Sequence, residues 1–171
     1  MDVVEELKAR EDIRQLAQRY ALAVDGKDID TVATLFAPDV DNGRYGQGHE
    51  GVKRFYDQAL RNFHCSMHLV ANHVVDFDDD DHAHGVVYCR AQHHVLEPEH
   101  WFDMALAYWD TYERFDGRWI FRRRRLRSWY TQYVGHPEHG TARVRYEAGA
   151  SGPQRGQQMP EAFETFEAFW S

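Results

Sequence analysis

Two hydrophobic periods divide the chain, a helical one in its first third and a strand-like one from residue 65 onward. Between residues 4 and 24, apolar positions recur at spacings of three and four, which predicts an amphipathic helix with one buried stripe. Shorter segments with the same spacing predict helices over residues 29–36 and near residues 52–60. Gly26 directly follows the first helix, as is typical of a helix C-terminus, and Asp28 is suited to cap the start of the second helix.

From residue 65 the apolar positions alternate, which predicts four strands over residues 65–77, 82–96, 101–114 and 118–133. Between the last two strands, Asp116-Gly117 is a strong hairpin signal. Helices followed by successive antiparallel strands define the α+β pattern, with the helices packed on one face of the sheet. We therefore predict one α+β body over residues 1–134.

The last part of the chain, residues 135–171, has a different character. Residues 135–160 are rich in Gly and Pro and have no hydrophobic period, which predicts a loop. Large aromatic residues then recur at helical spacing, which predicts a terminal helix over residues 161–170. We expect this helix to dock on the body or on a neighbouring subunit.

Composition and length narrow the class of protein. The 171 residues suit one domain with a sizeable core. No apolar run approaches the roughly 20 residues that span a bilayer, and the acidic start lacks the hydrophobic segment of a signal peptide. Two cysteines, Cys65 and Cys89, do not make a disulfide framework. We therefore expect a cytoplasmic protein with reduced thiols and no membrane partner.

The formal net charge of −8 argues against nucleic acid as the main partner. The one basic run, over residues 122–127, lies within a predicted strand rather than in a tail. It is typical of a solvated or interface-facing strand edge with one or two arginines turned inward.

An acid and an imidazole suggest chemistry most directly. Asp25 falls at the end of the first helix and His68 near the start of the first strand, so a helix packed on the sheet can bring them together. A carboxylate bonded to one imidazole nitrogen fixes the tautomer and raises the basicity of the other nitrogen. We predict that this pair abstracts a proton and returns it to a leaving group.

Strand alternation places a second histidine near the same region. His68 shares its strand face with Ser66, Val70, Asn72, Val74 and Asp76. On the next strand, His93 is in phase with apolar positions, so its side chain points toward the core or a cavity. His93 is either a second acid/base group or a buried structural histidine.

Phenols and an arginine could stabilise a developing oxyanion. Tyr20, Tyr45 and Tyr108 are the candidate phenols. Ideal helical geometry separates positions five apart by about 140°, so Tyr20 and Asp25 share a pocket only if the helix end bends or the pocket is wide. Period two splits the arginines of the last strand into two sets, with Arg124 in one and Arg127 in the other, and leaves open which set faces inward.

Eleven histidines raise the possibility of a metal enzyme. The candidates are His82-Ala83-His84, His93-His94 and the segment from His136 to His139. The first lacks the glutamate a few residues later that cupin-type sites use, the last lies in a predicted loop, and no H-E-x-x-H or zinc-type cysteine cluster is present. No phosphate-binding or nucleotide motif is present either. We expect no metal and no cofactor.

Four short segments, in order, resemble the SnoaL-like proteins of the nuclear-transport-factor-like superfamily. They are Tyr20 to Asp28, Leu35 to Asp39, Ser66-Met67-His68 and Tyr112 to Trp119. The resemblance covers roughly residues 5–133. It implies a cone-shaped α+β barrel in which helices and a curved antiparallel sheet enclose a pocket, and a homo-oligomer, trimer or dimer.

Within that group the segments are most similar to bile acid dehydratase, scytalone dehydratase and hexachlorocyclohexane dehydrochlorinase. The resemblance implies that Asp25 and His68 form a general-base dyad. Tyr20 matches the tyrosine of the bile acid enzyme, and His93 matches the second histidine of scytalone dehydratase. The resemblance also implies a functional arginine on the last strand, with the register among Arg124, Arg125 and Arg127 open.

These observations predict a cofactor-independent, dehydratase-like lyase. Asp25, His68, Tyr20 and His93 are its expected catalytic residues, and Tyr45, Tyr108, Arg124 and Arg127 its expected substrate contacts. The many aromatic residues suggest a bulky apolar or aromatic small molecule as substrate. The same dyad could instead start a C–C cleavage that releases a small aldehyde, or an isomerisation or cyclisation. A non-catalytic ligand-binding module is the alternative from another class.

Overall fold

A computed structural model describes residues 1–134 and 163–171. Three α-helices and a 3₁₀ helix come first, four strands follow, and one short helix ends the chain. Their bounds are α1 Val3–Asp25, α2 Ile29–Thr34, η1 Gly43–Tyr45, α3 Gly48–Leu60, β1 Cys65–Phe77, β2 His82–Leu96, β3 Glu99–Phe115, β4 Arg118–Val134 and α4 Glu164–Trp170.

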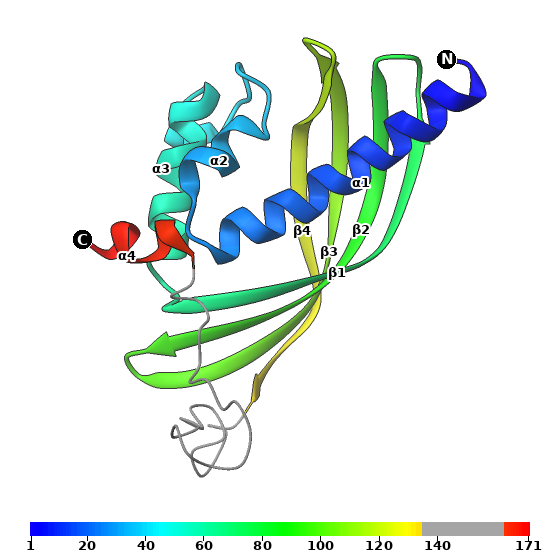
Figure 1. Cartoon of the computed structure of the whole chain (residues 1–171). Helices are drawn as coiled ribbons and strands as arrows, with labels where there is room; N and C mark the ends of the chain where they lie inside the picture. Colours follow the sequence, from blue (N-terminus) through cyan, green and yellow to red (C-terminus); the bar gives the residue numbers. More distant parts are fainter. Residues whose placement is uncertain (135–162) are drawn as a thin grey trace, which may run out of the picture.

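The sheet is a simple meander whose long strands bend strongly. Its order is β1-β2-β3-β4, and each neighbouring pair is antiparallel. α1 crosses the sheet, and α2 and α3 lie toward one end, on the same side as α1 (Figure 1). The predicted α+β cone is confirmed, with helices on one face of a curved antiparallel sheet.

The end of α1 differs from the prediction in an informative way. Gly26 has an ordinary right-handed conformation, and the left-handed position is taken by Lys27, with φ of 57°. Gly26 is needed for space instead: a Cβ there would lie 2.9 Å from the Phe163 ring. The turn therefore brings the last residues of the chain against the end of α1.

The second helix is shorter than predicted because its last residues pair with the sheet. Phe36 forms a parallel bridge with Phe121 of β4, and the backbone amide of Phe121 donates to the Leu35 carbonyl. This bridge ties the helical layer to β4. The predicted loop over residues 135–160 lies outside the described residues.

A β-bulge between Val70 and His73 changes which β1 side chains face the helices. Before the bulge, Ser66 and His68 face inward. After it, Val75 is buried and Val74 is exposed, so the prediction that Val74 and Asp76 share the face of His68 is wrong. One extra residue reverses the alternation, and period two alone gives no sign of it.

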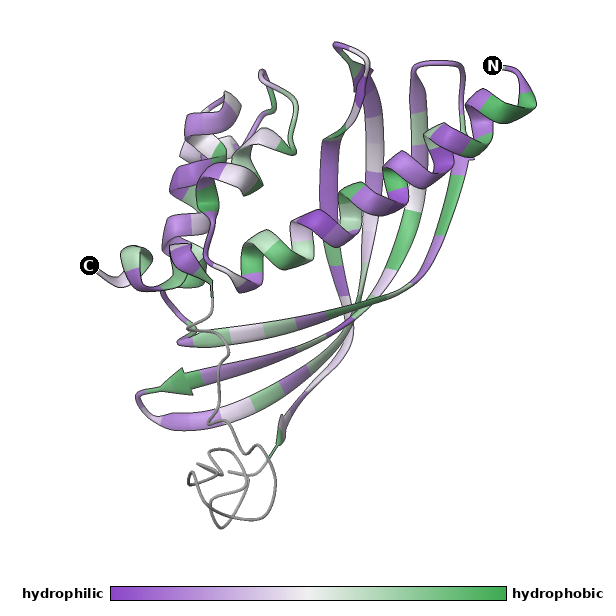
Figure 2. Ribbon diagram, viewed as in Figure 1, coloured by the Kyte–Doolittle hydropathy of each residue, from purple (hydrophilic) through white to green (hydrophobic). Residues whose placement is uncertain are grey.

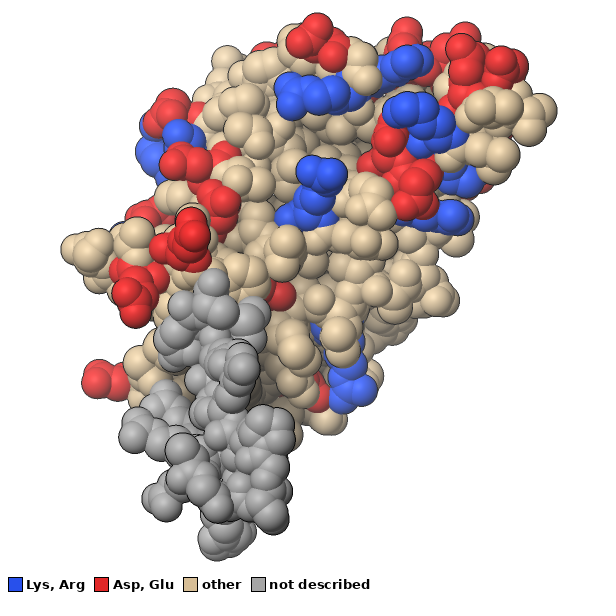
Figure 3. All heavy atoms as spheres, viewed as in Figure 1, with Lys and Arg blue, Asp and Glu red and all other residues tan. Residues whose placement is uncertain are grey.

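The core lies between the inner face of the sheet and the helices. Apolar and polar segments alternate along the strands, as expected for a sheet covered on one face (Figure 2). On the face seen in Figure 3, acidic side chains gather over α3 and α4. No helix among the described residues is long and apolar enough to cross a membrane.

Candidate active site

Asp25 and His68 form a close and largely buried pair. Oδ1 of Asp25 lies 2.6 Å from Nδ1 of the His68 ring, and Oδ2 accepts the backbone N–H of His68 at 2.8 Å. The side chains of His68 and Asp25 are only 7% and 13% exposed. Because the carboxylate grips both the ring and the backbone, the imidazole is fixed with Nδ1 toward the acid.

Ser66 completes the environment of the carboxylate. Its hydroxyl donates to Oδ1 of Asp25 at 2.8 Å. Ser66 and His68 are two residues apart on β1, so strand alternation places both side chains on the inner face. Asp25 reaches them because it is the last residue of α1, where the helix ends over the start of β1.

The other ring nitrogen of His68, Nε2, has no hydrogen-bond partner among residues 1–134 and 163–171. With Nδ1 directed at the carboxylate, Nε2 is the nitrogen left to accept a proton. An imidazole held in this way by a carboxylate can act as a general base.

His93 lies beside the dyad, as its strand phase predicts. Its ring is perpendicular to that of His68, with centroids 5.6 Å apart, and is stacked on Phe102. Nδ1 of His93 is buried without a hydrogen-bond partner among the described residues. Burial, helped by the neighbouring His68, lowers the pKa of His93 to about 4. His93 is therefore neutral at pH 7.

Three phenols meet on the inner side of the fold. The Tyr56 hydroxyl donates to the Tyr20 hydroxyl at 2.9 Å, and the rings of Tyr20 and Tyr108 lie 5.7 Å apart. Burial raises the pKa of all three, whereas Arg124 and hydrogen bonds from the other two hydroxyls oppose the rise at Tyr20. Tyr20 is therefore the best proton donor of the three.

Of Arg124 and Arg127, Arg124 faces inward. Its guanidinium is paired with a carboxylate rather than exposed in a cavity. Its guanidinium donates to both oxygens of Asp110, at 2.9 and 2.7 Å. It also lies 4.1–4.2 Å from the ring centroids of Tyr20, Tyr108 and Phe121. Burial would lower the pKa of Arg124, but the Asp110 carboxylate raises it. Arg124 is thus a permanent buried cation beneath the phenols.

Two of the predicted substrate contacts lie apart from this cluster. The Tyr45 hydroxyl bonds to Arg44 and Gln58, and its ring packs on Phe55. Arg127 is exposed and pairs with Ala107, so it is on the opposite sheet face from Arg124. The structure therefore brings the predicted residues together in two groups. Asp25, His68 and His93 form one group, and Tyr20, Tyr108 and Arg124 form the other.

Sequence reasoning missed two members of this buried polar group. Tyr56 lies in the helix predicted near residues 52–60, where helical spacing indicates a core position and gives no sign of a hydroxyl partner. Asp110 carries a visible signal: it is an acid in phase with Leu106, Tyr108 and Tyr112 on one strand face. A carboxylate on an apolar strand face indicates a buried partner of opposite charge.

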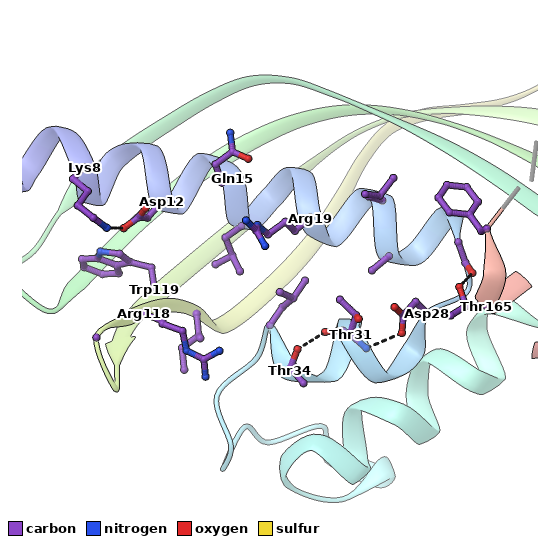
Figure 4. A pocket seen from close by; sticks show the side chains of 18 residues that line it. Lys8, Asp12, Gln15, Arg19, Asp28, Thr31, Thr34, Arg118, Trp119 and Thr165 are labelled. Carbon is purple, nitrogen blue, oxygen red and sulfur yellow. Dashed lines mark hydrogen bonds and ion pairs between the residues drawn. The ribbon is translucent and has the colours of Figure 1, made fainter.

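A groove of about 710 Å³ lies on another side of α1, between this helix, α2 and the β3–β4 hairpin (Figure 4). Arg19 and Arg118 extend along it, and Leu16, Leu35 and Ile120 contribute apolar surface. Neither Asp25 nor His68 lines this groove, and no histidine of residues 1–134 or 163–171 is among its lining residues. Within those ranges the groove therefore has no imidazole of the kind found at the dyad.

Within the described ranges, no three His, Cys, Asp or Glu side chains come together in a way that could hold a metal ion. The paired histidines of the surface bond instead to single carboxylates: His84 to Asp78, and His82 to Asp79.

The fold and this site define a class of protein, an α+β cone with an acid–imidazole pair between its first helix and first strand. The SnoaL-like domain family matches residues 5–125, and the chain belongs to that family. The family expected from the four sequence segments is thereby confirmed. No curated protein matches the chain.

Solved structures share the fold. A scytalone dehydratase-like protein from Novosphingobium aromaticivorans is 23% identical, with a TM-score of 0.68, covering 77% of this chain and 91% of that one. LinA is 25% identical, with a TM-score of 0.71 and coverages of 78% and 95%. The hexachlorocyclohexane dehydrochlorinase LinA-type3 from Novosphingobium barchaimii is 23% identical, with a TM-score of 0.69 and coverages of 77% and 93%.

Proposed function

We propose that the protein is a cofactor-independent lyase in which the Asp25–His68 dyad acts as general base. The observation that carries the proposal is the two-point grip of Asp25 on the ring and backbone of His68, which leaves Nε2 to take a proton. The structural neighbours include a dehydratase-like protein and dehydrochlorinases, whose names describe eliminations. Both supports favour elimination on a small molecule.

The reaction proceeds in two proton transfers. Nε2 of His68 takes a proton from a carbon next to a carbonyl or an aromatic ring, while Asp25 stabilises the imidazolium that forms. The electrons of the C–H bond become the new double bond, and the leaving group departs with its own bonding pair. Where the leaving group is hydroxide, the imidazolium returns the proton to it and water is released.

Negative charge that develops on the substrate oxygen needs a donor. Tyr20 is that hydrogen-bond donor. Its oxygen already accepts a hydrogen bond from the Tyr56 hydroxyl, so its own hydrogen is left to donate to the substrate. Arg124 acts through this phenol rather than on the substrate, since Asp110 and three aromatic rings enclose its guanidinium. His93, neutral at pH 7, orients the leaving group as a hydrogen-bonding imidazole.

The substrate class follows from the surroundings of the two histidines. Phe63 and Phe102 pack on His93. An aromatic or bulky apolar molecule with an activated C–H and a β leaving group suits these neighbours.

The proposal is tested with a panel of aryl β-hydroxy ketones, whose loss of water gives a conjugated, strongly absorbing enone. The wild-type protein is expected to dehydrate at least one compound in the presence of a strong chelator. His68→Gln and Asp25→Asn should each lower that rate by about 10²–10⁴.

A matched control is available on the surface of the same sheet. His84 and Asp78 form a similar imidazole–carboxylate pair with Nδ1 and Oδ1 2.9 Å apart, and both are exposed. His84→Gln should leave the rate unchanged. If the panel compounds bind tightly but wild type and His68→Gln react equally slowly, the protein is a ligand carrier.

We also propose that the chain forms a homo-oligomer through the outer face of the sheet. The helices lie on the inner face of the sheet, and the outer face exposes Tyr88, Trp109 and Trp129, the last two more than half exposed (Figure 1). Arg125 and Arg127 lie among them, where aromatic faces can bind guanidinium groups of a second copy. Trp129→Glu should therefore lower the sedimentation coefficient to that of a monomer, whereas an unchanged value would contradict this surface as the interface.

A further inference from the structure

Lys27 is a lysine buried where the dyad-bearing segments meet. Only 2% of the residue is exposed. Its ammonium donates to the carbonyl of Leu60 at 2.9 Å and to that of Phe63 at 2.8 Å. Leu60 is the last residue of α3, and Phe63 lies in the short link from α3 to β1. A cation at a helix C-terminus satisfies free carbonyls and is favoured by the helix dipole.

The final helix closes over the same ammonium. The ring centroids of Phe169 and Trp170 each lie 5.3 Å from Nζ of Lys27. Thr165 of α4 donates to the Gly26 carbonyl, one residue away. Burial lowers the pKa of Lys27 to about 8, with Cys65 and Asp25 opposing the shift, so the side chain is mostly charged at pH 7.

The backbone conformation of Lys27 indicates that its side chain makes stabilising interactions. Its φ of 57° lies in the left-handed region, where a residue with a Cβ costs roughly 1 kcal/mol and glycine is the usual occupant. A lysine in that position therefore has interactions that offset the strain. The two carbonyls and two aromatic rings are those interactions.

The placement relates directly to the dyad. Lys27 is two residues after Asp25, and Phe63, whose carbonyl it holds, is five residues before His68. The ammonium thus connects the end of α1, which carries the acid, with the chain entering β1, which carries the base. It acts beside the hydrogen bonds of Asp25 to Ser66 and to the His68 backbone, which join the same two segments directly.

We infer that Lys27 is a positioning residue that holds Asp25 and His68 in register by joining the end of α1 to the α3–β1 link. The inference rests on the proposed function of the dyad. Lys27 acts by fixing the positions of the two segments and not by contact with substrate. Removing the ammonium should loosen the Asp25–His68 hydrogen bond without removing either partner.

The protonation site of the His68 ring can be measured by NMR. Long-range ¹H–¹⁵N correlation spectra of histidine-labelled protein show which ring nitrogen carries the proton, and His68→Gln identifies the His68 signals. Wild type should show one His68 tautomer, protonated at Nδ1. Lys27→Met keeps the strained backbone and the apolar stem, and should give a mixture of tautomers and a dehydration rate lower by up to about 10²-fold.

Two further variants keep the test decisive. Arg61→Met removes another cation that lies over Phe169, 4.7 Å from its centroid, and should leave the His68 tautomer unchanged. Lys27→Gly removes the ammonium while relieving the left-handed strain, so it serves if Lys27→Met does not fold. A single Nδ1–H tautomer in a folded Lys27 variant would overturn the positioning role, whereas its absence from wild type would instead count against the proposed dyad.

Discussion

Arg124 and Asp110 form a two-point ion pair inside the protein, with exposed fractions of only 4% and 0% for the two side chains. The guanidinium of Arg124 contacts the rings of Tyr20 and Tyr108, two of the phenols that meet on the inner side of the fold. Tyr112 adds a further hydrogen bond to the Asp110 carboxylate at 3.0 Å. This buried pair therefore fixes the phenol that we assign to the oxyanion.

Breaking this ion pair from one side should be strongly destabilising. Asp110→Ala leaves the Arg124 cation buried and unpaired, and we expect the free energy of unfolding in urea to fall by about 3–5 kcal/mol. Arg122→Met is the surface comparison, because Arg122 pairs with Asp39 in an exposed position and should cost about 1 kcal/mol or less. A loss below 1 kcal/mol for Asp110→Ala would contradict the buried pair.

Removing only the hydroxyl of Tyr20 separates oxyanion stabilisation from packing. Tyr20→Phe keeps the ring contacts with Tyr108 and Phe121 but deletes the donor. Loss of one oxyanion donor typically lowers kcat by about 10²–10³, and we expect a decrease of that order on a substrate found in the panel. Tyr45→Phe, in a distant phenol, should keep the wild-type kcat, and equal rates for both variants would refute the assignment.

The buried His93 makes stability depend on pH. Its pKa is lowered from 6.5 to about 4 by burial and by the nearby His68 and Lys27, against the opposite influence of Asp25 and Asp103. Between those two values the unfolded chain binds a proton that the folded protein does not. Stability from this group is therefore complete above pH 6.5 and is lost as the pH falls toward 4.

The effect is measured by urea unfolding at pH 7.5 and pH 5. His93→Gln should unfold with a free energy that falls less between these two values than that of wild type, by on the order of 2 kcal/mol. His84→Gln, in an exposed histidine of the same strand, is the control. Parallel pH dependences for wild type and His93→Gln would show that His93 titrates normally in the folded protein.

Much of the fold could be predicted because the hydrophobic periods are long and regular. Strands β1 and β2 have the predicted bounds, and α1 differs by one residue at each end. Asp25 and His68 could also be identified from the sequence, because helices packed on a sheet can bring the end of the first helix close to the start of the first strand. The structure adds the hydrogen bonds between them, and their catalytic roles belong to the proposed function.

Three features could not be predicted from the sequence because they depend on local backbone geometry or on long-range contacts. The bulge after Val70 reverses the facing of Val74 and Asp76 without any sequence mark in the alternation. Arg124 could not be separated from Arg127 until strand register paired it with Asp110. Lys27 lies in a turn, and its partners are 33 and 36 residues away.

Chemical rescue by imidazole tests whether the imidazole of His68 is the base. His68→Ala leaves a gap about the size of the deleted ring beside Asp25, and its dehydration rate should be about 10²–10⁴ lower than that of wild type. Added imidazole should restore part of the rate in proportion to its neutral form, and should have no effect in Asp25→Asn/His68→Ala. A His68→Ala rate close to wild type, or one that imidazole does not change, would contradict the role of His68 as the base.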